Sequence, residues 1–337
     1  MFNLTKDKEE HALALYRKSI VIDCHQDSAL SRGYLLKMLN AGVTAANLPG
    51  ANLDKIAETY NVIEQNSDII FGPISTVKDI LRAKRERKIA AFMQCESNFP
   101  LNGNTDLLPL FHKLGLVQMQ PTYNNRNAFA DGCAERTNCG LSNLGIELVE
   151  RMNKLNMIVD CSHVGIKTTL DVCEHAKFVS ASHSNARAIC DNVRNKTDEE
   201  TKVIAEKDGV QGIVGFPTFV KWTKGEKGEW PTVKDVMDHV DYIANLVGIE
   251  HVGVGLDLVE GTDTLGPIAP GKGLGCWPKL YGKPGPDGFI RYTVGLDSIS
   301  ELPNLAKGLV ARGYSDEEIQ GVLGENWLRL FKRAWGE

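Results

Sequence analysis

The chain lacks the features that mark membrane-spanning and nucleic-acid-binding proteins. No apolar run in its 337 residues approaches the roughly 20 residues that a transmembrane helix needs. Its 38 lysines and arginines are outnumbered by 43 aspartates and glutamates, so the net charge of -5 offers no basic footprint for nucleic acid. No internal repeat or low-complexity tract is present. We therefore expect neither a nucleic-acid nor a membrane partner.

Paired cysteines and a secretory leader are also missing. None of the eight cysteines belongs to a CxxC motif, and Cys24, Cys95, Cys161 and Cys190 lie within or beside apolar runs. This placement predicts buried thiols and not a disulfide framework. The charged segment 1–19 reads as a helix and has no continuous apolar stretch typical of a signal peptide. Together these absences predict a cytoplasmic protein.

Short apolar runs recur along the chain at spacings too wide for hairpins. They cover residues 18–23, 42–48, 88–95, 115–120, 156–161, 177–182, 210–216 and 251–256. The runs are almost continuously apolar, as expected for parallel strands covered on both faces. Helical periodicity lies between them, for example over 144–156 and 232–247. The pattern predicts an α/β fold, a (β/α)8 TIM barrel, with residues 1–337 in one domain and its core over 18–335.

Two long segments and the C-terminal region complete the predicted architecture. Residues 121–141 and 260–290 are rich in glycine, proline and asparagine, and each follows a predicted strand. We expect both to lie over the C-terminal mouth of the barrel as lid or substrate loops, with surface decoration as the alternative for the second. Near the C-terminus we predict two helices, with Ser315 as an N-cap and a break at Gly324.

Residues of metal-ligand type stand at the ends of several predicted strands. They are His25 and Asp27, then Glu96, His163 and His183. Strand exits are where barrel enzymes build their metal sites. The first two are separated by one residue, so on extended backbone they leave the same face. Each also has a structural alternative: a histidine bonded to an aspartate, a loop-capping acid, or a histidine at the barrel rim.

The five groups divide into two metal sites. We expect His25 and Asp27 to hold one ion, His163 and His183 to hold the other, and Glu96 to join them through its two oxygens. This nitrogen and oxygen set suits Zn²⁺ best, although Mn²⁺, Co²⁺ or Fe²⁺ are also compatible. Two such ions would lower the pKa of a bridging water and polarise a substrate carbonyl.

Two further residues complete the predicted chemistry. Asp257 ends the last apolar run, and we assign it as the proton shuttle between the attacking water and the leaving amine. Its alternatives are a metal ligand or a structural acid. Arg194 lies in the loop after the strand of His183, where it can hold a substrate carboxylate by a bidentate pair. Its alternative is an ordinary surface contact.

Long stretches of the chain resemble the renal (membrane) dipeptidase family, peptidase family M19. The matching segments are IDCHQD, QCES, GLSNLGIELVERMNKLNMIVDCSH, SHSNARAICDNVRNKTDEE, HVGVGLD and GENWLRLF, in family order from near residue 20 to near residue 330. The resemblance implies a binuclear zinc peptidase on an amidohydrolase-like barrel. It also implies the same ligands, with Glu96 shared by both ions, Asp257 as acid and base, and Arg194 on the substrate carboxylate.

The substrate-contacting residues depart from the family pattern. The family usually places two glycines and a histidine after the shared glutamate, where this chain has Ser97, Asn98 and Phe99. In the family a histidine also lies over the substrate, and Tyr123 takes that place here. A tyrosine can donate a hydrogen bond to an oxyanion but brings no positive charge. The family also has an acidic pair after the last strand. This chain departs from that pattern, because Leu258, Val259 and Glu260 follow Asp257.

The resulting prediction is a metallo-dipeptidase. It would hydrolyse the amide bond of dipeptides, including those with a C-terminal D-residue as the family does, by a hydroxide bridging two metal ions. One alternative is hydrolysis of another carboxylate-bearing amide, such as an N-acyl amino acid. The other is a catalytically idle barrel that binds a small ligand. The resemblance further implies that the chain forms a homodimer.

Overall fold

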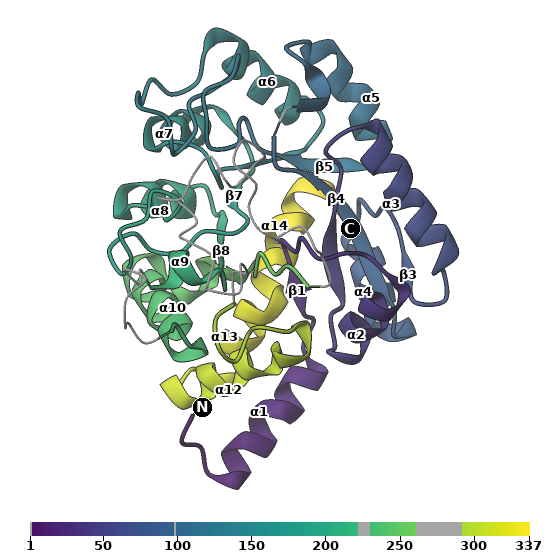
Figure 1. The fold of residues 1–337 in the computed structure, drawn as a ribbon, viewed down its shortest axis with the longest axis vertical. Helices are drawn as coiled ribbons and strands as arrows, with labels where there is room; N and C mark the ends of the chain where they lie inside the picture. The colour runs from purple at the N-terminus through teal and green to yellow at the C-terminus, as the bar shows by residue number, and fades with distance from the viewer. Residues whose placement is uncertain (1, 98, 222–229, 261–291) are drawn as a thin grey trace, which may run out of the picture.

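The computed structural model describes residues 2–97, 99–221, 230–260 and 292–337. Helices surround a set of short strands (Figure 1). The strands are β1 (Ile22–Asp23), β2 (Ala45–Pro49), β3 (Ile70–Phe71), β4 (Ile89–Cys95), β5 (Leu116–Met119), β6 (Ile158–Asp160), β7 (Val179–Ala181), β8 (Val210–Ile213) and β9 (Val252–Val254). The helices are α1 (Lys6–Lys18), α2 (Arg32–Asn40), α3 (Leu53–Gln65), α4 (Val77–Glu86), α5 (Leu108–Lys113), α6 (Asn143–Lys154), α7 (Ile166–His175), α8 (Asp198–Glu206), α9 (Pro217–Val220), α10 (Val233–Val247), α12 (Pro303–Arg312), α13 (Asp316–Gln320) and α14 (Asn326–Trp335).

All strand pairings in the sheet are parallel, in the order β1-β2-β4-β5-β6-β7-β8-β9. Hydrogen bonds also link the first strand of this path to the last. The amide of Cys24 donates to the carbonyl of Val254 over 2.9 Å, and the amide of Asp257 donates to the carbonyl of His25 over 2.9 Å. A parallel bridge between Gln26 and Leu258 continues this contact. The eight predicted strands are therefore confirmed, and they form a (β/α)8 barrel.

One short strand was not predicted. β3 comprises two residues and pairs only with β4, beside the main path of the sheet. It precedes a cis Gly72–Pro73 bond. Two apolar residues before a Gly-Pro step are too few to produce a strand signal in the sequence.

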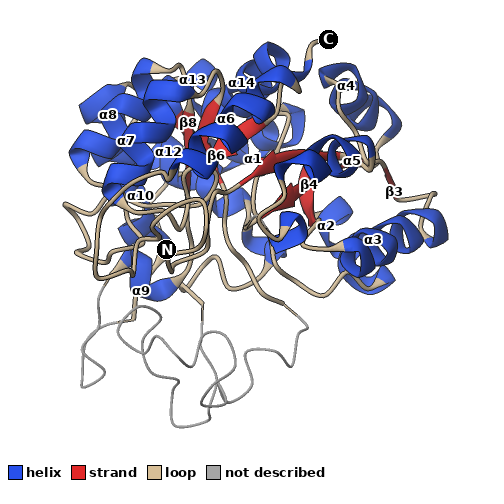
Figure 2. Ribbon diagram, turned by 90° about the horizontal axis from the view of Figure 1, so that it is seen from above, coloured by secondary structure: helices blue, strands red, loops and turns tan. Residues whose placement is uncertain are grey.

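Helix α14 closes the end of the barrel opposite the C-terminal ends of the strands. Figure 2 shows it on one side of the strands, with the connecting loops gathered on the other. Its residues Trp327, Leu330 and Phe331 share a buried cluster with residues of β1, β2, β4, β5, β6 and β8. The indole of Trp327 donates to the carbonyl of Val254 over 3.0 Å. The aromatic C-terminal segment thus seals the barrel floor.

The predicted break at Gly324 is wrong. A π-helical turn, Gly321–Glu325, joins α13 to α14 without interruption. Gly324 is required for close packing, because a Cβ atom there would lie 2.4 Å from the carbonyl oxygen of Ile20. The predicted N-cap is confirmed: Ser315 accepts from the amide of Glu318, and the Glu318 carboxylate accepts from the amide of Ser315 in a capping box.

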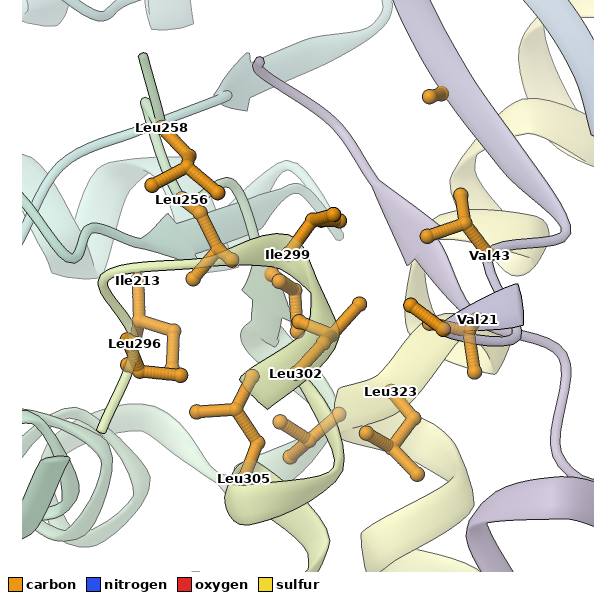
Figure 3. Packing of buried hydrophobic residues seen from close by; sticks show 14 of the residues in the cluster. Val21, Val43, Ile213, Leu256, Leu258, Leu296, Ile299, Leu302, Leu305 and Leu323 are labelled. Atoms are coloured by element: carbon orange, nitrogen blue, oxygen red, sulfur yellow. The ribbon is translucent and has the colours of Figure 1, made fainter. Parts of the chain in front are cut away.

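The largest buried cluster lies outside the barrel wall, between the sheet and the helices. Figure 3 shows part of it, where Val21, Val43, Ile213 and Leu256 meet side chains from the segment around α12. This apolar layer contains residues of β2, β3, β4, β8 and β9 and packs these strands against the helices. Across the described ranges, no helix has the length and hydropathy needed to cross a bilayer.

Candidate metal centre

Three imidazoles and one carboxylate meet at the C-terminal mouth of the barrel. His25, Glu96, His163 and His183 follow β1, β4, β6 and β7, so four different strands deliver them to one place. The Nε2 atoms of His25, His163 and His183 lie 3.3, 3.3 and 3.5 Å from Glu96 Oε1. The Nε2 atoms of His163 and His183 are 2.8 Å apart. The rings of His25 and His183 stack with centroids 3.8 Å apart.

The spacing of these atoms fits a divalent metal ion. Ligand atoms on one tetrahedral zinc lie roughly 3.3 Å apart, since each bond is about 2.0–2.1 Å long. The three distances to Glu96 Oε1 lie close to this value, whereas the Nε2 atoms of His163 and His183 are nearer to each other. The group of His25, Glu96 and His183 has all its ligand atoms within 4.8 Å of one another. The buried Nε2 of His25 has no hydrogen-bond partner among the described residues, as expected for a nitrogen that serves as a metal ligand.

The other predicted acidic residues lie around this group. Asp257 Oδ1 is 3.7 Å from His25 Nε2. Asp27 is exposed and does not belong to the group of His25, Glu96, His163 and His183 described above. Its charge nevertheless raises the pKa values of both Glu96 and Asp257. That His25 and Asp27 bind the same ion stays a prediction.

The electrostatics of the site keep the imidazoles neutral. Burial, followed by the charge of Arg194, lowers the pKa of His25 to about 3. Burial also lowers the pKa values of His163 and His183 well below the usual range. Neutral imidazole is the form that binds metals. Conversely, burial raises the pKa of Asp257 to about 8 and that of Glu96 well above its ordinary value, with nearby carboxylates adding to both. A bound cation would oppose these increases.

The second nitrogen of each imidazole is held by a neighbouring polar side chain. His183 Nδ1 lies 2.7 Å from Ser182 Oγ, and His163 Nδ1 lies 2.8 Å from Asn124 Oδ1. His25 Nδ1 lies 3.1 Å from the amide nitrogen of Gln94. The same amide nitrogen also donates to Ser182 Oγ over 3.3 Å.

Ser182, Asn124 and Gln94 were not predicted as functional. A signal for two of them exists in the sequence, since Gln94 interrupts an apolar run and Ser182 directly precedes a ligand histidine. Asn124 lies in the long loop 121–141, where no periodicity points to it. Its contact with His163 nevertheless confirms that this loop reaches the mouth of the barrel.

Two of the site residues adopt a backbone conformation that L-residues rarely occupy. His163 has φ 65° and Asp257 has φ 55°. Such positive values cost about 1–3 kcal/mol and cluster at functional sites. The strain therefore supports a functional interpretation of both strand ends.

The predicted substrate residues take different positions relative to the metal ligands. The ring of Tyr123 stacks on His163, with centroids 4.1 Å apart and 23° between the planes, and 37% of the tyrosine is exposed. Arg194 is only 1% exposed. Its Nη2 donates to the carbonyl of His183 over 3.0 Å, and its guanidinium lies 5.2 Å from the centre of the Phe219 ring. Its buried Nε has no hydrogen-bond partner within the described ranges.

The residues after Asp257 have structural roles. Leu258 is buried in the core. Glu260 pairs with Lys37 over 2.5 Å and accepts a hydrogen bond from the amide of Ile299. Asn98 lies outside the described residues, as does the predicted loop 260–290 beyond Glu260.

Comparison with known proteins identifies the family. The model of the family described as Membrane dipeptidase (Peptidase family M19) matches residues 46–267 and 284–335. The chain belongs to this family. Among curated M19-like relatives, Dipeptidase aclJ of Aspergillus oryzae is 28% identical over 84% of this chain and 63% of its own length. Dipeptidase 3 of Mus musculus is 28% identical over 74% of this chain and 45% of its own length. The chain thus aligns with about half to two thirds of these longer relatives.

Solved structures agree with this assignment. An amidohydrolase from Pseudomonas aeruginosa is 30% identical, with a TM-score of 0.85 over 97% of this chain and 99% of its own. A metallopeptidase from Rhodobacter sphaeroides, liganded with a phosphinate mimic of the dipeptide L-Ala-D-Ala, has a TM-score of 0.75. It is 20% identical over 94% of this chain and 100% of its own, and its likeness concerns the fold. The family expected from the sequence is confirmed.

Proposed function

We propose that this chain is a metal-dependent hydrolase that cleaves the amide bond of dipeptides, including those with a C-terminal D-residue. The observation that carries the proposal is the convergence of three imidazole Nε2 atoms on Glu96 Oε1 at the mouth of the barrel. Membership of the membrane dipeptidase family supports it. So does the dipeptide mimic bound by the Rhodobacter sphaeroides metallopeptidase of the same fold.

Two divalent ions, with Zn²⁺ preferred, are assigned to this centre. His25 and Asp27 would hold one ion, His163 and His183 would hold the other, and Glu96 would contact both. When bound, such ions make a hydroxide nucleophile available at neutral pH and polarise the scissile carbonyl.

Asp257 is assigned the proton transfers. Its carboxylate lies beside the metal ligands at the end of the last strand, 3.7 Å from His25 Nε2. From there it can take a proton from the attacking water and deliver it to the leaving amine. Its backbone φ of 55° is of the kind that clusters at functional sites.

Arg194 and Tyr123 are assigned to the substrate. Arg194 is held behind His183, and its unpartnered Nε gives a buried donor for a carboxylate. Tyr123 stacks on His163 and remains partly exposed, so its ring forms part of the wall that a substrate meets. A larger acyl group in place of the N-terminal residue is the second candidate substrate, because a tyrosine wall offers apolar surface where the family has a histidine.

The test is hydrolysis of a matched panel by protein of known metal content. The panel contains L,L- and L,D-dipeptides, their C-terminal amides and N-acyl amino acids. We expect dipeptide turnover at about two metals per chain, strongly reduced for the amides. Turnover of N-acyl amino acids alone would select the second candidate. Bound metal with no turnover on any member would contradict the hydrolase proposal and favour an idle ligand-binding barrel. A cytoplasmic location and a homodimer stay predictions.

A further inference from the structure

A buried carboxylate lies beneath the metal centre without a cationic partner. Asp160 ends β6 and is fully buried. Within the described ranges, no lysine or arginine lies within ion-pair distance of it. Five donors surround it instead. They are the amides of Ser162 and Ser182 at 3.3 and 2.6 Å, the hydroxyls of Ser180 and Ser182 at 3.2 and 2.5 Å, and the side-chain amide of Gln120 at 2.8 Å.

One of these donors connects Asp160 to a metal ligand. Ser182 Oγ lies 2.5 Å from Asp160 Oδ2 and 2.7 Å from His183 Nδ1. A hydroxyl has a single proton, and a carboxylate can only accept, so that proton points to Asp160. The Ser182 oxygen must then accept from the imidazole, which places the His183 proton on Nδ1. The lone pair of Nε2 is left facing Glu96 and His163.

The surrounding backbone fixes the serine in this position. The amide of Ser182 donates to Asp160 Oδ1, and the Ser162 hydroxyl accepts from the amide of His183 over 3.0 Å. Gly212 and Gly255 pack closely against the carbonyl oxygen of Ser182. A Cβ atom would lie 2.0 Å from this oxygen at Gly212 and 1.8 Å from it at Gly255. The remaining neighbours of the Ser182 hydroxyl are Gln94 Nε2 and Ser162 Oγ, each 3.3 Å away.

We propose that Asp160 and Ser182 are positioning residues that form a carboxylate–serine–histidine relay, which fixes the tautomer and direction of His183 as a metal ligand. This inference rests on the proposed function, in that it takes His183 to bind metal. The other two imidazoles contact neutral amides, those of Asn124 and Gln94. His183 is the one that a hydroxyl links to a carboxylate, so its ring nitrogen should be the most basic ligand of the three. Removing such an outer partner typically costs about 10–100-fold in metal affinity.

Ser182→Ala tests the relay, and Ser180→Ala is its matched control. Both serines are buried near the same strand and both donate to Asp160, but only Ser182 contacts His183. Affinity for Zn²⁺ and for Co²⁺ is measured by competition with a chromophoric chelator, together with the Co²⁺ absorption spectrum and the melting temperature of the metal-free protein. We expect Ser182→Ala to lose about 10–100-fold in affinity and to change the Co²⁺ spectrum. Ser180→Ala should keep both properties while losing similar thermal stability.

The outcomes separate this inference from the proposed function. Equal affinity and an identical spectrum in Ser182→Ala and wild type would overturn the relay, and so would equal losses in both serine variants. If Ser182→Ala does not fold, Asp160→Asn replaces it and should show the same loss, because the amide can turn its donor toward Ser182 and reverse the hydrogen bonds. Wild-type protein that binds metal but hydrolyses nothing would contradict the hydrolase proposal and leave the relay intact.

Discussion

One buried histidine that is not among the predicted metal ligands should contribute a decrease in the free energy of unfolding between pH 7 and pH 4. His239 lies on α10 and is fully buried. Its Nε2 donates to the carbonyl of Val220 over 2.8 Å, and its Nδ1 accepts from the amide of Ala186 over 3.2 Å. Both ring nitrogens are thus used by the neutral form. A second proton would displace the Ala186 amide, three residues after His183, and bury a charge.

The sign and size of the effect follow from the pKa. Burial lowers the pKa of His239 to about 4, although the carbonyl of Val220 and the charges of Asp238 and Asp235 oppose this decrease. The unfolded chain binds the proton near pH 6.5, whereas the folded chain does not until about pH 4. Stability is therefore complete above pH 6.5 and is lost as the pH falls toward 4. At about 1.4 kcal/mol per pH unit, the loss amounts to about 3 kcal/mol, a large part of a typical 5–15 kcal/mol.

The assay is urea unfolding of metal-free wild type and His239→Gln at several pH values from 7.5 to 4. Gln can still donate to Val220 but leaves the Ala186 amide unpaired, which costs roughly 1–3 kcal/mol at neutral pH. Between pH 7.5 and pH 4 the wild type should lose about 3 kcal/mol of unfolding free energy relative to the variant, which has no proton to gain, so the initial difference should disappear or reverse. The exposed His11→Gln serves as control for general effects of losing a histidine. A difference that stays constant across the pH range would refute the reasoning.

Further predictions concern the site. Asp257→Asn should keep its metals and lose about 10²–10⁴-fold in kcat, as checked by metal quantification and initial rates; near-normal kcat would remove the proton-transfer role. His183→Ala should lose metal and activity together, which dialysis followed by metal analysis can detect. Arg194→Met should raise KM most for substrates with a free carboxylate, and an equal effect on amidated substrates would exclude this contact. Gly255→Ala should lower the melting temperature clearly, since its Cβ would overlap the Ser182 carbonyl, 1.8 Å away; an unchanged Tm would contradict this packing.

Most of the barrel was predictable because its strands are local features of the sequence. Eight apolar runs separated by helical periodicity correspond to eight parallel strands, although each observed strand is shorter than its run. The errors arose where a tertiary contact decides the structure. Gly324 has the sequence appearance of a helix break, but its role is set by the carbonyl of Ile20, which is distant in the chain. That residues 1–337 form one domain stays a prediction.

The metal ligands could be predicted, whereas the residues that orient them could not. A histidine or carboxylate at a strand end is visible in the sequence, as with His163 and Glu96. The partners of these ligands depend on the register between strands. Asp160 lies beside Ser180 in the sheet, and this pairing brings it under Ser182 and His183. The available signal was a carboxylate inside the apolar run 156–161, a costly placement unless donors surround it.

The acidic character of the barrel mouth connects the fold to its proposed chemistry. Glu96 and Asp257 have raised pKa values because they are buried together, and Asp27 and Asp23 add to the repulsion at Asp257. The charge that opposes them at both positions is that of Arg194. The imidazoles add no positive charge, because burial lowers their pKa values and keeps them neutral. The side chains of the site therefore carry more negative than positive charge. Divalent cations would supply that charge without protonating the ligands, which explains why a stable barrel retains so many acids at one buried place.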